Sequence, residues 1–231
     1  MIFAANFKAN HTRASTKVYI QTLETLAQKV ENPIYVFPPL SAIDDFATSK
    51  LVVGVQNAYP ARNGAFTGEV GVEQLEEFGI KTILIGHSER REILGESQES
   101  VAKKFAFFKE QGFAIIYCLG EPLEVRQEGQ EALQEYLFAQ LEGIDLHYDK
   151  LIVAYEPIWA IGTGVSATTA DIRATHQLLK KVITQAPLLY GGSAKLDNIK
   201  EIADISEVDG VLVGSASLDA HNFFAMIEAS R

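Results

Sequence analysis

Three side chains that could move protons or bind negative charge each follow a short apolar stretch of the sequence. Glu156 comes directly after Leu-Ile-Val-Ala-Tyr, His87 follows Ile-Leu-Ile-Gly, and Lys8 follows Phe-Ala-Ala-Asn-Phe. A carboxylate at the end of a buried strand can lose hydration, which raises its pKa and makes it a stronger base. Taken singly, Glu156 could equally be a solvated carboxylate, a lone histidine is more often structural, and a solvated surface position is the usual place of a lysine. Together they suit acid–base chemistry on an anion.

The neighbours of His87 and Lys8 sharpen both expectations. His87 precedes Ser88-Glu89-Arg90-Arg91, a stretch that can begin a short helix, and a helix N-terminus disfavours a cationic imidazole. Asn6 and Lys8 are two positions apart, so in an extended chain their side chains point to the same side. There an amide and an ammonium group could bind an oxyanion. No function is assigned to the remaining histidines, which are His11, His147, His176 and His221.

Two glycine-rich turns predict a phosphate site. Gly191-Gly192-Ser193 and Gly214-Ser215 each follow an apolar stretch, and glycine lets backbone N–H groups approach phosphate oxygens closely. One such turn alone is merely a turn, whereas two turns after the last two strands of a barrel are a more specific signal.

A further glycine pattern, Gly162-Thr163-Gly164-Val165-Ser166-Ala167, resembles a dinucleotide fingerprint but does not fulfil its requirements. The fingerprint needs its first glycine directly after a strand and an acid about 20 positions later, whereas here Glu156 to Ile161 intervene and position 182 is Val. The segment is better interpreted as a lid, in which Trp159 and Ile161 cover a ligand.

Apolar runs and amphipathic stretches alternate along the whole chain. The apolar runs predict eight strands, at 2–6, 34–37, 51–56, 82–85, 113–118, 151–155, 188–190 and 210–213. The amphipathic stretches predict eight helices, at 15–30, 41–47, 72–78, 97–111, 130–141, 170–183, 196–203 and 220–229, with Asn10 or Thr12 as the first cap. Strands so uniformly rich in Val, Ile, Leu and Phe are typical of a parallel sheet covered by helices.

The number and size of these units indicate the architecture. Eight units in 231 residues average about 29 residues, near the minimum for a parallel crossover. No linker or change of composition divides the chain, and eight is the number at which a parallel sheet closes on itself. We therefore predict an α/β fold with a single (β/α)8 barrel over residues 1–231, with an open doubly wound sheet as the alternative. In a barrel the residues that follow the strands gather at one mouth.

Composition excludes several classes of function. With 20 Lys and Arg against 30 Asp and Glu, the net charge of −10 argues against sequence-independent binding to nucleic acid or to an anionic membrane surface. No apolar run approaches the roughly 20 residues of a membrane helix, and the first residues do not form a secretory signal. The single cysteine, Cys118, excludes an internal disulfide framework and suits a reducing compartment, so we expect a cytoplasmic protein.

From end to end, the chain resembles the triosephosphate isomerase family. The matching stretches are Asn6-Phe7-Lys8, Gly64-Ala65-Phe66-Thr67-Gly68-Glu69, Gly86-His87-Ser88-Glu89-Arg90-Arg91, Tyr155 to Gly164, Tyr190-Gly191-Gly192-Ser193 and Val213-Gly214. The resemblance implies a TIM barrel that interconverts dihydroxyacetone phosphate and glyceraldehyde 3-phosphate through an enediolate, in glycolysis and gluconeogenesis, with no cofactor and no metal. It implies that Glu156 is the base, that neutral His87 polarises the carbonyl, and that Lys8 and Asn6 stabilise the oxyanion.

The same resemblance implies further roles around the substrate. Backbone N–H groups of Gly162, Ser193, Gly214 and Ser215 are expected to bind the phosphate. A lid from Pro157 to about Ala167 is expected to close over it; its central residues are Pro157, Ile158, Trp159, Ala160, Ile161, Gly162, Thr163 and Gly164. Tyr190 and Ser193 match positions that bond the closed lid, and Glu121 matches the one that holds Trp159 when the lid is open. Glu89 matches a buried carboxylate beside Lys8 and His87, and Cys118 matches a structural cysteine behind the base.

The family is homodimeric, which implies a second copy of this chain as a partner. Thr67 lies in the loop that matches the one reaching the partner's site, and Glu69 and Arg90 match positions that pair across the interface. Two departures concern the site: Ser215 replaces a usual glycine, and Val165 replaces the usual lysine of the distal hinge.

Two rival functions stay open at this point. A metal-dependent sugar-phosphate epimerase would share the phosphate loops, but it would use two aspartates, and no such acid pair follows the strands here. A non-catalytic phosphate-binding relic would keep the pocket, yet every expected catalytic position is intact.

Overall fold

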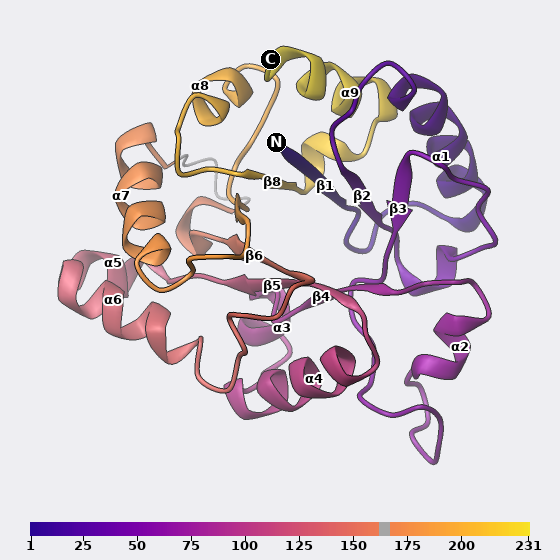
Figure 1. Ribbon diagram of the computed structural model, residues 1–231, viewed down its shortest axis with the longest axis horizontal. Helices are drawn as coiled ribbons and strands as arrows, with labels where there is room; N and C mark the ends of the chain where they lie inside the picture. Colours follow the sequence, from indigo (N-terminus) through magenta and orange to yellow (C-terminus); the bar gives the residue numbers. More distant parts are fainter. Residues whose placement is uncertain (162–166) are drawn as a thin grey trace.

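The computed structural model describes residues 1–161 and 167–231, which form a ring of eight parallel strands with helices around it (Figure 1). The strands are β1 (Ile2–Asn6), β2 (Ile34–Phe37), β3 (Leu51–Val53), β4 (Thr82–Ile85), β5 (Ala114–Leu119), β6 (Leu151–Tyr155), β7 (Leu188–Tyr190) and β8 (Gly210–Val213). Their order in the sheet is β3-β2-β1-β8-β7-β6-β5-β4. A parallel bridge between Val55 and Ile83 joins the two ends, so the ring closes.

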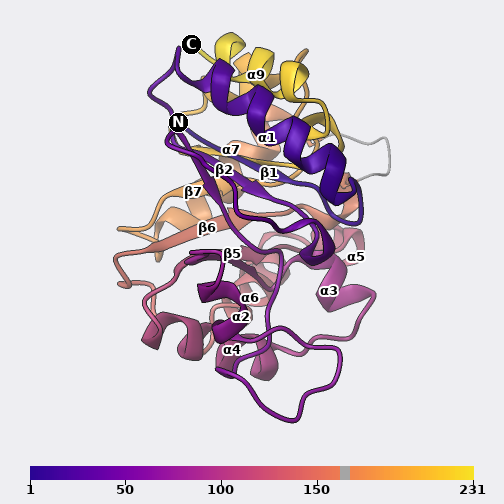
Figure 2. The ribbon, with the colours of Figure 1, turned by 90° about the vertical axis from the view of Figure 1, so that its right-hand side faces the viewer.

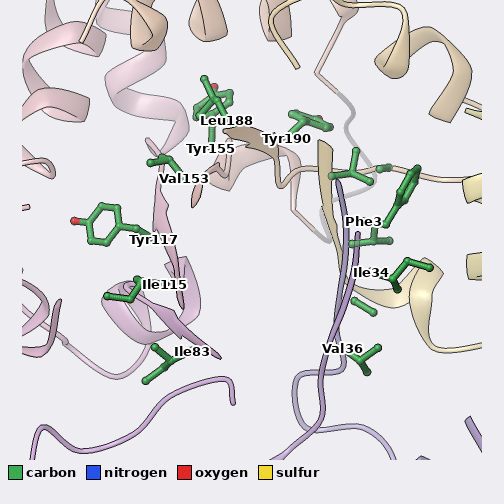
Figure 3. Packing of buried hydrophobic residues seen from close by; sticks show 14 of the residues in the cluster. Phe3, Ile34, Val36, Ile83, Ile115, Tyr117, Val153, Tyr155, Leu188 and Tyr190 are labelled. Carbon is green, nitrogen blue, oxygen red and sulfur yellow. The ribbon is translucent and has the colours of Figure 1, made fainter. Parts of the chain in front are cut away.

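Alternating side chains along each strand divide the interior into two layers. One set fills the inside of the ring and consists of Ala4, Phe37, Leu84, Ile116, Cys118, Ile152, Ala154, Leu189 and Leu212. The other set points outward beneath the helices and includes Phe3, Ile83, Tyr117 and Tyr155 (Figure 3). Both faces of most strands are therefore buried, which explains why the strands read as continuous apolar runs; β3 is the exception, since its Val52 is exposed.

The helices cover the outside of the ring (Figures 1 and 2). They are α1 (Arg13–Ala27), α2 (Val72–Glu76), α3 (Ser88–Glu92), α4 (Gln98–Glu110), α5 (Leu123–Glu128), α6 (Gln130–Ala139), α7 (Thr169–Lys180), α8 (Ile199–Ala203) and α9 (Ala220–Ala229). Within residues 1–161 and 167–231 there are also three short 3-10 helices, η1 (Leu40–Ala42), η2 (Ile158–Ala160) and η3 (Ser215–Ser217). No helix in the described ranges is long and apolar enough to span a membrane.

Local chemistry explains where several helices begin. The side chain of Thr12 accepts a hydrogen bond from the backbone N–H of Ser15, so the prediction of Thr12 as a cap of α1 is confirmed. Thr168 forms a reciprocal capping box with Asp171 at the start of α7. Asp219 caps α9 through the backbone N–H of Asn222.

The predicted helix at 41–47 is wrong, because only η1 forms and Ile43 is already extended. Contacts with α1 hold this segment in irregular form. Arg13 donates to Asp44 at 2.9 Å through two nitrogens, and the carboxylate of Glu24 accepts backbone N–H bonds from Ser49, Lys50 and Leu51. These tertiary bonds replace the helical bonds that the sequence pattern favoured.

Two short helices follow strands without a long periodic pattern. The sequence only suggested a first turn after His87, which the structure extends to α3, and it gave no sign of α5. α5 spans six residues between Pro122 and Gly129, whose φ of 108° ends it. The predicted (β/α)8 barrel is confirmed, and the carboxyl ends of its strands form the mouth where the site lies.

Candidate active site

A cavity of about 180 Å³ opens at the mouth of the barrel. The sequence-predicted residues that line it are Asn6, Lys8, His87, Glu156, Ile161, Ser193, Gly214 and Ser215. They come from loops after β1, β4, β6, β7 and β8, so residues distant in sequence meet at one place. The predicted phosphate ligand Gly162 and the predicted lid residues Thr163 and Gly164 lie outside the described residues, as does Val165.

Glu156 is the innermost acid of this cavity, with 1% of its surface exposed. It continues the inward register of Ile152 and Ala154 on β6, which carries its carboxylate to the axis of the ring. Two glycines leave room for it. A Cβ at Gly120 would lie 1.7 Å from the carbonyl oxygen of Glu156, and one at Gly191 would lie 2.8 Å from its Cγ.

His87 contacts the carboxylate directly. Its Nε2 lies 3.0 Å from Oε1 of Glu156, while Oε2 accepts the backbone N–H of Ser88 at 3.0 Å. At the start of α3, Nδ1 of His87 accepts the backbone N–H of Glu89 at 3.2 Å. A nitrogen that accepts carries no proton, so this geometry fits a neutral ring with its proton on Nε2, donated to Glu156.

The pair shifts the acidity of both groups. Burial raises the pKa of Glu156. His87, the N–H of Ser88 and Lys8 together lower it by more than burial raises it, so the pKa of Glu156 lies below its ordinary value. The expectation of a raised pKa is therefore wrong for this arrangement, because the carboxylate has donors that compensate for lost hydration. For His87, burial lowers the pKa, while Glu156 and Glu89 raise it by more.

Lys8 adopts a left-handed backbone conformation, with φ of 52°, that residues other than glycine rarely adopt. Its N–H donates to Oδ1 of Asn6 at 3.0 Å, and its carbonyl accepts from Nε2 of Gln56 at 2.9 Å. Both sides of the unusual residue are thus held by side chains. Gln56 was not among the predicted site residues, although a polar residue that ends an apolar run is the signal that could have found it.

The ammonium group of Lys8 is paired with Glu89, at 2.5 Å between Nζ and Oε1. Glu89 also lies 3.8 Å from Nδ1 of His87, so its two expected neighbours are present. Its side chain is 42% exposed, however, and the expectation of a buried carboxylate is wrong for the single chain. Glu89 lies on α3, whose outer side is open to solvent here.

The two glycine-rich turns lie together beside Lys8. Ser193 is fixed by Asn198, whose Nδ2 donates to the Ser193 carbonyl at 3.0 Å. Asn198 was not among the predicted site residues. Gly214 precedes η3, whose Ser217 hydroxyl donates to the Gly214 carbonyl at 2.7 Å. Ser215 has no positive φ, so its departure from glycine causes no backbone strain.

The first half of the predicted lid is held down by an acid. Pro157 leads into η2, and the indole N–H of Trp159 donates to Oε1 of Glu121 at 2.9 Å. The same oxygen accepts the hydroxyl of Tyr155, also at 2.9 Å. Burial raises the pKa of Glu121 despite these donors. Arg126, which sequence analysis missed, lies over the Trp159 ring at 5.6 Å.

Cys118 and Tyr190 are both buried near the site, and their supporting roles stay predictions. Cys118 is fully buried inside the ring, and burial raises the pKa of its thiol well above the ordinary value. The Tyr190 hydroxyl is buried and has no hydrogen-bond partner within the described part of the chain. Among the described residues, no group of three or more His, Cys, Asp or Glu is arranged to hold a metal ion.

The predicted interface residues come from two segments, the loop before α2 and helix α3. Thr67 and Glu69 are exposed in a loop that extends away from the barrel beside α2 (Figures 1 and 2). Within the loop, Tyr59 packs on Phe66 with ring centroids 4.2 Å apart. Arg90 donates to Glu96 of its own chain at 3.2 Å.

Comparison with known proteins identifies the family. The family model described as Triosephosphate isomerase matches residues 1–230. The chain belongs to the triosephosphate isomerase family. It is 62% identical to the triosephosphate isomerase of a Sulfurovum species, over 99% of this chain and 100% of that relative. The triosephosphate isomerases of Wolinella succinogenes and of a Nitratiruptor species are 57% and 55% identical, and each is covered over 99% of its length. The predicted family and isomerase class are confirmed.

Proposed function

We propose that this chain interconverts dihydroxyacetone phosphate and glyceraldehyde 3-phosphate by proton transfer between neighbouring carbons. The observation that carries the proposal is the contact of Glu156 with His87, 3.0 Å apart at the floor of a cavity that Lys8 also lines. A base, a neutral proton donor and a cation at one point are what an enediolate intermediate requires.

The base must leave its present partners to act. Glu156 is bonded to His87 and to the N–H of Ser88, so it turns toward the substrate carbon and gives up both bonds. Its departure frees the Nε2–H of His87 for the substrate carbonyl. It also removes the carboxylate that raises the pKa of His87, and burial then favours the neutral ring.

Proton transfer then proceeds in two balanced halves. Glu156 takes a proton from one carbon, the electron pair forms the carbon–carbon double bond of the enediolate, and the carbonyl oxygen becomes an oxyanion. His87 moves a proton between the two oxygens, and Glu156 returns its proton to the other carbon. Lys8 and Asn6 stabilise the oxyanion, and preorganised donors of this kind are worth about 3 kcal/mol each.

The phosphate end is proposed to bind at the turns after β7 and β8. Ser193, Gly214 and Ser215 line the cavity there, and their backbone N–H groups are the proposed donors, with Gly162 as a fourth. We propose that the segment beginning at Pro157 closes over the phosphate and excludes water, so that the enediolate does not lose phosphate. The Glu121 contact of Trp159 fits the open state.

A homodimer in the cytoplasm is proposed as the working form. A second cavity of about 320 Å³ adjoins the first and shares Asn6, Lys8 and His87 with it. Beside it, Ile93 and Leu94 are 75% and 64% exposed. The protruding Thr67 loop of one copy is of the kind that fills such a hollow in another, and Glu69 and Arg90 would then face each other across the interface.

The test is a coupled-dehydrogenase assay with each triose phosphate, with and without a chelator. We expect turnover in both directions that the chelator leaves unchanged. Turnover that depends on an added divalent metal would indicate the epimerase alternative. Phosphate binding without turnover would indicate the non-catalytic relic.

A further inference from the structure

The cavity has a deficit of positive charge for the substrate proposed above. Lys8 is neutralised by Glu89 at 2.5 Å, and Glu156 adds a carboxylate while His87 fits the neutral form. These four groups therefore sum to about one negative charge. The whole chain carries −10, so a phosphate ester with two negative charges meets repulsion as it approaches.

Lys195 lines the same cavity at its rim. It lies in the turn after β7, two residues beyond Ser193, and it is exposed. Among the described residues that line this cavity, it is the one cation to which the structure assigns no ion pair. Its charge is therefore not shared with a carboxylate, unlike that of Lys8, which is paired with Glu89.

The backbone of Lys195 is fixed relative to the phosphate donors. Its N–H donates to Oδ1 of Asn198 at 2.7 Å, and Nδ2 of the same asparagine donates to the carbonyl of Ser193 at 3.0 Å. One side chain thus braces both residues. The loop that carries Lys195 is therefore anchored, so binding does not have to order its backbone.

We propose that Lys195 supplies the unpaired positive charge that attracts the phosphate dianion into the cavity and favours phosphate esters over uncharged trioses. This inference rests on the proposed function and deepens it. A single charge near the rim, in partly hydrated surroundings, changes the encounter with a dianion by about fivefold at low ionic strength, and salt screens most of this effect.

The experiment compares three variants with the wild type. Lys195→Met removes the charge and keeps an apolar stem, and Lys195→Arg keeps the charge. Lys181→Met is the matched control, because Lys181 is also exposed and follows α7 at the opposite end of the barrel. For each, kcat/KM is measured with glyceraldehyde 3-phosphate and with glyceraldehyde, at about 0.01 M and about 0.3 M ionic strength. Binding of inorganic phosphate is measured by calorimetry.

We expect Lys195→Met to lower the ratio of the two kcat/KM values about fivefold at low salt, through KM, and to weaken phosphate binding by a similar factor. The loss shrinks at high salt and is absent in Lys195→Arg and Lys181→Met. An unchanged ratio, or an equal effect of Lys181→Met, would overturn the role of Lys195. Because phosphate binding is measured without turnover, a wild type that binds phosphate but does not isomerise triose phosphates would count against the proposed function alone.

Discussion

At the residue scale, the site is a set of paired groups that a reaction must rearrange. Glu156 is bonded to His87 and to Ser88, and in the proposed mechanism it gives up both bonds to reach a substrate carbon, while Lys8 is already bonded to Glu89. These contacts keep the charges in place when the cavity holds no ligand. They also mean that the pKa values of the free site differ from those during catalysis.

Shortening the base tests its distance from the proton it removes. We expect Glu156→Asp to lower kcat about 100-fold or more, because its carboxylate recedes by about one methylene from the reacting carbon, while KM changes little. Steady-state kinetics in both directions measure this. Equal losses in kcat and in binding would count against the role as base.

Removing the ammonium group tests the oxyanion site. Lys8→Ala is expected to lower kcat/KM about 1000-fold, because in the proposed mechanism the cation contacts the oxygen where charge develops. Far-ultraviolet circular dichroism should match that of the wild type, since alanine meets the same backbone restriction at φ of 52° as lysine and keeps the backbone bonds to Asn6 and Gln56. Retained turnover would remove Lys8 from the site.

Sequence predicted the central side chains because each follows a buried strand, where position alone implies a place at the mouth. It missed Gln56, Arg126 and Asn198, which act through the backbone or ring of another residue. Such contacts depend on loop geometry, which alternation along a strand does not encode. It also mistook the pKa direction of Glu156, because the donors that oppose burial come from a different strand–helix unit.

At the element scale, strands were easier to predict than helices. Both faces of β1, β4 and β6 are covered, and their bounds match the predicted apolar runs. Around 41–47 the outcome was decided by α1, whose Arg13 binds Asp44 within the segment and whose Glu24 binds the residues just after it. Helix propensity is a weak preference that such tertiary bonds exceed.

Helix α7 carries a buried histidine that makes the stability of the fold depend on pH. His176 is fully buried, its Nδ1 donates to the carbonyl of Glu207 at 3.1 Å, and its Nε2 has no partner among the described residues. Burial lowers the pKa of His176 to about 4. Between about pH 6.5 and about pH 4, His176 is therefore protonated in the unfolded chain and neutral in the folded chain.

The free energy of unfolding is expected to decrease as the pH falls from about 6.5 to about 4, with His176 contributing up to about 1.4 kcal/mol per pH unit. Urea titrations at several pH values measure the slope. His176→Asn keeps a donor for Glu207 and should flatten the slope, whereas His147→Asn, on an exposed turn, is the control. An identical slope in His176→Asn would show that other groups cause the dependence.

At the scale of the whole molecule, the barrel was predictable because the repeat number and the absence of linkers leave few other ways to bury eight parallel strands. The proposed association between copies rests only on family resemblance. The Thr67 loop is polar and rich in glycine, and nothing in its pattern distinguishes an interface from an ordinary surface excursion.

Shortening the Thr67 loop tests the proposed dimer. Deleting residues 65–68 should yield monomers with weak activity, because Lys8 and Glu89 would lose the cover that a partner provides. Sedimentation velocity measures the change in mass, and the coupled assay measures the activity. A sedimentation profile identical to that of the wild type would refute the interface.

The ring of strands has one weakly bonded junction, the seam between β3 and β4, where local opening is expected to begin. Between β3 and β4 the contact is the Val55 bridge, with bonds from Val55 N–H to Thr82 and from Leu84 N–H to Val55. Rupture of this seam costs fewer interstrand bonds than rupture between β5 and β6, where five residue pairs are in register. It would carry Lys8 and Gln56 away from His87. The Val55 and Leu84 amides should therefore exchange with deuterium early, in the same local opening events that separate Lys8 and Gln56 from His87.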